Sequence, residues 1–140
     1  MIRPIPVHHE IPANPIGEDW ICSDVHGEFQ LLMELLVGSG FEPAKDRLFM
    51  LGDVIDRGPE SLRALEWVLN TCYCYSVLGN HELLFWASHY QAAWADKHYS
   101  IGGQWAADLA PEQHGVLAEK IQEKLSLTMT LNTESGRIGL

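Results

Sequence analysis

The amino-acid sequence predicts an α/β domain built around a parallel sheet. Short apolar runs that read as buried strands alternate with segments of helical periodicity, in the order strand, helix, strand, helix, strand. A polar segment containing Asp, His or Asn follows each of the three strands. Because ligands bind at the carboxyl ends of the strands in such sheets, these segments predict a functional site at that edge.

The elements follow one another in a simple order. Residues 1–19 contain four prolines and predict an extended arm, whereas residues 20–140 predict one domain. We expect strands at 20–23, 47–51 and 73–78, with helices at 28–37, from about 61 to 69, from 81 onward and at 112–125. Gly102-Gly103 interrupts the helical pattern, and a hairpin is expected with strands at 128–132 and 137–140. The last of these strands is expected to form an open sheet edge.

Composition excludes several classes of partner. The net charge of −10 and the pI near 5.0 argue against nucleic acid or an anionic membrane, since both would be repelled. Three cysteines, an odd number, without a recognisable secretory signal predict reduced thiols and a cytoplasmic location. No apolar run reaches the length of a transmembrane helix. Composition predicts no oligomeric state.

Four residues at the strand ends are candidate metal ligands. Asp24 and His26 stand two positions apart after the first strand and can chelate one ion from the same side. Asp53 follows the second strand, and its two oxygens can bridge a pair of ions. Asn80 follows the third strand and offers a neutral amide oxygen, although Gly79-Asn80 is also a common turn sequence. Their recurrence at three strand ends favours a divalent metal site.

A second group of residues suits phosphate chemistry. His81 can donate a proton to a leaving oxygen, and Asp56 can hold its imidazole in the required tautomer. Arg57 presents a planar fork for phosphate oxygens, with a surface salt bridge to Glu60 as the alternative. Glu82 is either a residue of the metal site or an acidic residue complementing the dipole of the helix it begins.

These motifs have a family resemblance. Gly52-Asp53-Val54-Ile55-Asp56-Arg57-Gly58 and Gly79-Asn80-His81-Glu82 resemble the calcineurin-like metallophosphoesterases, and among them the bacterial and phage serine/threonine protein phosphatases of the phage lambda type. The similarity extends from about residue 20 to residue 140 and includes Gly102-Gly103-Gln104-Trp105. The resemblance implies the N-terminal half of a β-sandwich flanked by helices.

The resemblance also implies roles for individual residues. The first metal ion is held by Asp24, His26 and Asp53, and the second by Asp53 and Asn80. His81 is the proton donor oriented by Asp56, Arg57 and Asn80 contact the phosphate, and a hydroxide bridging the two ions attacks phosphorus. Mn²⁺ is the expected metal, with Fe and Zn²⁺ as alternatives, because mixed His and carboxylate ligands suit all three. The substrate is expected to be a phosphorylated protein or a small phosphoester.

The chain departs from this family pattern after its final strand. The family carries later His segments similar to Val-His-Ala and Gly-His-Thr and a second phosphate-binding Arg, and none of these is found in the sequence. We therefore expect an N-terminal fragment with impaired activity. Two alternatives stay open: a nucleotide hydrolase of the symmetric diadenosine tetraphosphate type, whose second motif usually lacks an Asp equivalent to Asp56, and a non-catalytic module binding one metal ion or none.

Overall fold

The first of two sheets is parallel and follows the chain order. The structure, a computed structural model, describes residues 4–140. Strands β2 (Asp19–Cys22), β3 (Arg47–Met50) and β4 (Cys74–Ser76) lie side by side in that order, all parallel. Helices α1 (Phe29–Ser39) and α2 (Ser61–Asn70) connect them. The predicted order of strand, helix, strand, helix, strand is confirmed.

The second sheet contains a strand that the sequence analysis did not predict. β1 (His8–Ile11) lies within the segment expected as an extended arm, and it pairs in parallel with β5 (Thr128–Thr133). β6 (Gly136–Gly139) completes the sheet as an antiparallel partner of β5. Residues 1–3 of the expected arm lie outside the described residues. Part of the expected arm is therefore a strand of this sheet, because β1 pairs with β5, about 120 positions away in the sequence.

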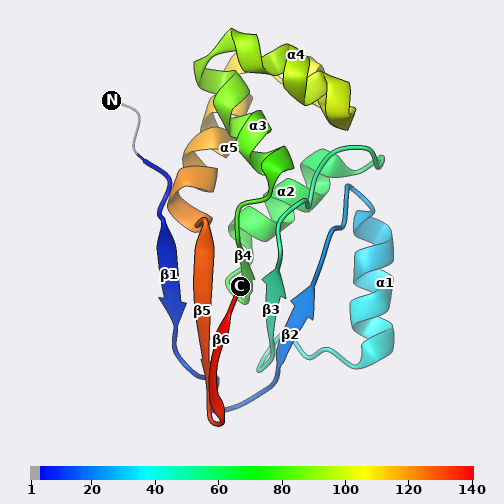
Figure 1. The fold of residues 1–140 in the computed structure, drawn as a ribbon. Helices are drawn as coiled ribbons and strands as arrows, with labels where there is room; N and C mark the ends of the chain where they lie inside the picture. Colours follow the sequence, from blue (N-terminus) through cyan, green and yellow to red (C-terminus); the bar gives the residue numbers. More distant parts are fainter. Residues whose placement is uncertain (1–3) are drawn as a thin grey trace.

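Helical segments cover the end of the first sheet at which its strands finish. α3 (Asn80–Tyr90) and α5 (Pro111–Lys124) pack against each other. Four short helical segments join them: η1 (Ala92–Trp94), α4 (Ala95–His98), η2 (Tyr99–Gly103) and η3 (Gln104–Asp108). Figure 1 shows this joining segment above the loops that follow β2 and β3. Within residues 4–140, no helix combines the length and the apolar character needed to span a membrane.

The core is divided by β3, which is buried on both faces. Leu48 and Met50 point into the main cluster between the sheet and the helices, whereas Phe49 packs with Met129 and Leu131 on the opposite side. Continuous burial of this kind is expected for the central strand of a parallel sheet. β3 is therefore a rigid support for the loop that begins at its carboxyl end.

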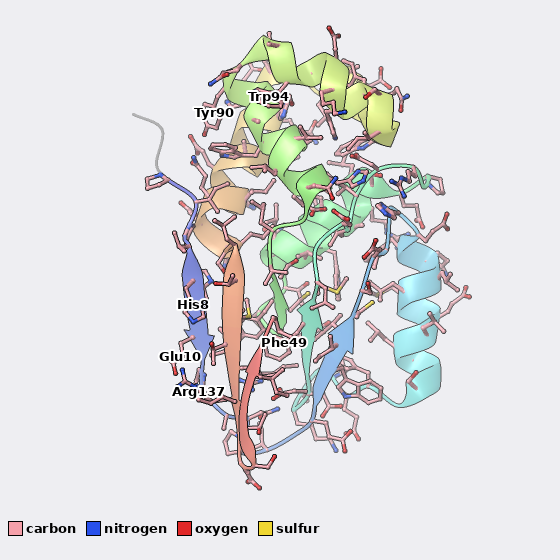
Figure 2. All side chains as sticks on the ribbon, viewed as in Figure 1. His8, Glu10, Phe49, Tyr90, Trp94 and Arg137 are labelled. Carbon is pink, nitrogen blue, oxygen red and sulfur yellow. The ribbon has the colours of Figure 1, made fainter. Side chains whose placement is uncertain are left out.

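The open edge predicted at the end of the chain is present. All four residues of β6 are exposed, and β6 lies at the edge of its sheet. Arg137 on this strand forms an ion pair of 3.6 Å with Glu10 of β1, reaching across β5 (Figure 2). This pair is exposed to solvent, so we assign it little stabilisation.

Asp46 fixes the turn before β3 and gives a first prediction. Its buried carboxylate accepts hydrogen bonds of 2.9 Å from the backbone N–H groups of Glu18 and Glu42, and these bonds lower its pKa below the ordinary value of 3.8. The unfolded chain therefore binds this proton more tightly than the folded protein does. The stabilisation is complete above about pH 3.8 and is lost as pH falls through the folded pKa.

Asp46→Asn is expected to lower the free energy of unfolding at pH 7, because the amide offers only one acceptor atom to the two N–H groups. The difference from the wild type should shrink as pH falls below about 3.8. Urea unfolding of both proteins between pH 3 and pH 7 measures it. A difference that stays constant over this range would contradict the assignment.

Candidate functional site

The backbone at the ends of β2 and β3 adopts conformations that ordinary residues rarely occupy. In the described part of the chain, four residues other than glycine have positive φ: His26 (47°), Asp53 (51°), Asp56 (73°) and Arg57 (71°). All four are predicted site residues. Such conformations cost free energy and tend to occur where function requires a side chain in a fixed direction.

Backbone contacts draw the three strand ends together. The N–H groups of Val25 and His26 donate to the carbonyl of Asp53 at 3.1 and 3.0 Å. Gly52 approaches the third strand end so closely that a Cβ there would lie 2.5 Å from the backbone nitrogen of Gly79. Gly52 also has a φ of +84°, so both space and conformation require glycine at this position.

Asp24 and His26 lie next to each other, as their spacing predicts. Asp24 Oδ2 is 3.5 Å from His26 Nε2, and the Asp24 side chain is about half exposed. A hydrogen bond of 2.9 Å from the Ser23 hydroxyl lowers the pKa of Asp24, with smaller contributions from His26 and Arg57. His26 Nδ1 donates to the Ile55 carbonyl at 3.0 Å, so the Nε2 lone pair faces the site and accepts from Arg57 Nη1. This is the orientation in which histidines bind metal ions.

Asp53 lies at the centre of the site. One ligand atom from each of His26, Asp53 and His81 falls within 4.8 Å of the others. The end of the Asn80 side chain lies 3.2 and 3.3 Å from the two carboxylate oxygens of Asp53, and its amide nitrogen donates to them. A half-turn of this amide would present its oxygen to a cation bound beside Asp53.

His81 and Asp56 form the predicted pair. His81 Nδ1 lies 2.7 Å from Asp56 Oδ2, and both side chains are almost completely buried. Since a carboxylate only accepts, Nδ1 carries the proton and Nε2 faces the site. Burial alone would raise the pKa of Asp56, but hydrogen bonds from His98, Trp105 and His81 outweigh it, and the pKa is lowered. Asp56 is thus held as a carboxylate.

Arg57 faces the two histidines of the site. Its Nη1 lies 3.2 Å from His26 Nε2 and its Nη2 lies 3.4 Å from His81 Nε2. The alternative partner, Glu60, pairs with Arg63 at 2.8 Å instead. An exposed guanidinium at this position can reach the oxygens of a phosphate bound beside the two histidines.

Glu82 lies in the first turn of α3, as expected for a residue that complements the helix dipole, and its carboxylate also holds the loop after β3. Its buried carboxylate accepts hydrogen bonds from four backbone N–H groups, at 2.8 to 3.2 Å, which belong to Asp53, Val54, Ile55 and Gly79. Burial raises its pKa, although these bonds act in the opposite direction. Glu82 therefore fixes the loop that carries Asp53 and directs none of its described contacts to a candidate ligand side chain.

Two further residues join the site from the segment above it. His98 Nε2 lies 3.0 Å from Asp56 Oδ1, and Trp105 Nε1 donates to the same oxygen at 2.7 Å. The sequence analysis gave neither residue a role, because short turns carry no periodic pattern that would align them. The only available signal was the resemblance of Gly102-Gly103-Gln104-Trp105 to a family segment.

The residues present fit divalent metal ions. Imidazole nitrogens, a carboxylate and an amide oxygen together suit Mn²⁺, Fe and Zn²⁺. The ligand atoms of His26, Asp53 and His81 lie within 4.8 Å of one another, close enough for one cation to contact all three. For a second ion, the predicted ligands among residues 4–140 are Asp53 and Asn80.

Comparison with known proteins gives the family. The calcineurin-like phosphoesterase model matches residues 20–128, and the chain belongs to this family. It is 36% identical over 124 residues to serine/threonine-protein phosphatase 1 of Salmonella typhimurium, an alignment covering 86% of this chain and 55% of that protein. It is 40% identical over 65 residues to a symmetrical bis(5'-nucleosyl)-tetraphosphatase of Photorhabdus laumondii, covering 46% of this chain and 24% of the relative.

A solved structure supports the fold. The chain superimposes on a protein serine/threonine phosphatase from Saccharomyces cerevisiae with a TM-score of 0.63 and 21% identity. The match covers 91% of this chain and 40% of the yeast protein. The predicted α/β fold, matching the N-terminal part of a calcineurin-like phosphoesterase, is thereby confirmed. The chain spans about half the length of the Salmonella relative.

Proposed function

We propose that this chain carries the metal-binding and proton-donating part of a phosphomonoesterase that acts on phosphoserine or phosphothreonine in proteins. The observation that carries the proposal is the meeting of His26, Asp53 and His81 within 4.8 Å, with Asp56 behind His81. The 36% identity to a serine/threonine phosphatase supports the substrate class. A cytoplasmic location is part of the proposal, supported by three free cysteines.

The side chains of the site have separate roles in the proposed reaction. Asp24, His26, Asp53 and Asn80 would hold two divalent ions, Mn²⁺ foremost. When bound, the ions polarise the phosphoryl group and activate water. Arg57 binds two phosphate oxygens through its guanidinium and fixes the phosphoryl group. His81 gives a proton from Nε2 to the leaving oxygen, and Asp56 stabilises the positive charge that the imidazole carries beforehand.

His81 is also placed where it could be a third ligand. A histidine whose other nitrogen is bound to a carboxylate is common in metal sites. The two roles are separated by His81→Asn, tested in the protein at its full natural length. If His81 is the proton donor, His81→Asn lowers kcat on phenyl phosphate by about 10²- to 10³-fold. The Mn²⁺ affinity of this variant then stays within about threefold of that of the wild type.

Calorimetric titration with Mn²⁺ and steady-state kinetics measure these two quantities. A large fall in Mn²⁺ affinity would make His81 a ligand instead. Absence of Mn²⁺-stimulated hydrolysis of para-nitrophenyl phosphate in the wild type would overturn the proposed function altogether, and would favour a non-catalytic module.

A nucleotide substrate is the second candidate, favoured by the 40% identity to a symmetrical tetraphosphatase. The site treats both substrates alike, since each presents a phosphoryl group. Asp56, which precedes Arg57, weighs toward the protein phosphatase. A panel of a phosphoserine peptide, a phosphothreonine peptide and diadenosine tetraphosphate, compared by kcat/KM, decides between them.

A further inference from the structure

We propose that His98 and Trp105 are positioning residues of the reaction, acting on His81 through Asp56. This inference rests on the proposed function, because it assigns the two residues to the proton-donating pair of that site. Neither residue is among the predicted ligands or phosphate contacts. Both reach Asp56 from the segment 92–108, which joins α3 to α5.

The Asp56 carboxylate is the meeting point of three rings. It is completely buried and receives His81 Nδ1 on Oδ2 at 2.7 Å and Trp105 Nε1 on Oδ1 at 2.7 Å. His98 Nε2 bridges both oxygens, at 3.0 and 2.9 Å. A buried carboxylate is costly unless hydrogen bonds replace its water, and His98 and Trp105 provide that replacement together with His81.

The protonation of His98 follows from its surroundings. Its Nε2 faces a carboxylate and carries a proton, while its Nδ1 is buried and has no hydrogen-bond partner among residues 4–140. A neutral ring leaves a lone pair unpaired at Nδ1, whereas a charged ring would bury an unpaired N–H and an additional positive charge. His98 and Trp105 thus both donate to the Asp56 carboxylate, and they fix its position against His81.

The segment that carries the two donors is packed tightly enough to hold them. Gly103 lies against the His98 ring so closely that a Cβ would be 2.3 Å from Nε2. Trp105 stacks on Phe85 of α3 with 5.4 Å between ring centroids and 7° between planes. The Gly102 carbonyl accepts from the backbone N–H of Arg57 at 3.2 Å. Gly102 has a φ of +112°, and a Cβ there would lie 2.8 Å from the backbone nitrogen of Arg57, so both positions require glycine.

The test uses two substrates that differ in their need for a proton donor. Phenolate is a poor leaving group and requires protonation, whereas para-nitrophenolate leaves readily without it. Trp105→Phe keeps the stacked ring and removes the N–H donor. We expect kcat on phenyl phosphate to fall about tenfold to a hundredfold, kcat on para-nitrophenyl phosphate about threefold or less, and both KM values to stay within about twofold.

Trp94→Phe is the matched control. Trp94 is the last residue of η1, is 44% exposed and lies near Tyr90 (Figure 2). It should leave both rates unchanged. A fall by the same factor on the two substrates in Trp105→Phe would show a structural role only, and unchanged rates would show no role; either result overturns the proposal.

A second pair of variants and a second measurement cover loss of folding. His98→Gln can still donate to Asp56, so it should retain more phenyl phosphate activity than His98→Leu. In the metal-free protein, ¹⁵N spectra of the imidazoles should show the His81 proton on Nδ1 in wild type and Trp94→Phe, and a mixture of tautomers in Trp105→Phe. This reading is independent of catalysis. An inactive wild type would overturn the proposed function alone, whereas an unchanged His81 tautomer in Trp105→Phe would overturn the positioning role.

Discussion

Asp53→Asn is expected to abolish metal-dependent hydrolysis and to weaken Mn²⁺ binding by at least about a hundredfold. Asp53 groups with His26 and His81, and its two oxygens face the amide of Asn80. The substitution removes one negative charge and one of two acceptor oxygens at this point. Isothermal titration with Mn²⁺ measures the binding, and para-nitrophenyl phosphate hydrolysis measures the activity.

The substitution is well suited to its purpose because asparagine tolerates the backbone of Asp53. Its φ of 51° lies in the left-handed region, which Asn occupies as readily as Asp does. Loss of function in Asp53→Asn therefore reports on the carboxylate and not on a misfolded loop. Asp96→Asn, at an exposed position of α4, is the control and should leave both quantities unchanged. Wild-type Mn²⁺ affinity in Asp53→Asn would rule out Asp53 as a ligand.

The parts of the fold predicted from the sequence are those determined by local pattern. β3 reads as a strand because Leu48, Phe49 and Met50 form a continuous apolar run, and its burial on both faces follows from that run. β1 was missed because His8-His9-Glu10-Ile11 has no such pattern. Its strand conformation is imposed by pairing with β5, a contact that no local window of sequence contains.

The candidate site also contains residues that local sequence pattern predicts and residues that only tertiary packing brings in. The proximity of Asp24 to His26 and of Asn80 to Asp53 could be predicted because each residue follows a strand and the ends of parallel strands meet, whereas their role as ligands stays a prediction. His98 and Trp105 could not be predicted, since their approach to Asp56 depends on how the turns between α3 and α5 pack. The left-handed backbone of Asp56 and Arg57 runs against ordinary residue preference. Local rules tend to fail in this manner at functional sites, where other contacts hold a strained conformation.

Glu82 holds the loop that begins with the left-handed residue Asp53, and its removal should have the largest effect on stability. Glu82→Ala leaves the N–H groups of Asp53, Val54 and Ile55 without their buried acceptor, together with that of Gly79. We expect the free energy of unfolding to fall by about 3 to 5 kcal/mol. Glu82→Gln should also destabilise, because its amide nitrogen would face backbone donors.

Urea unfolding and amide hydrogen exchange measure the effect at two scales. The unfolding midpoint should fall, and the amides of Val54 and Ile55 should exchange faster in Glu82→Ala even under conditions where the protein remains folded. Glu119→Ala, at an exposed position of α5, is the matched control and should change stability by no more than about 0.5 kcal/mol. If Glu82→Ala behaved like this control, the strained loop would be held by its glycines and by the contacts of Asp56, and the carboxylate of Glu82 would be dispensable to the site.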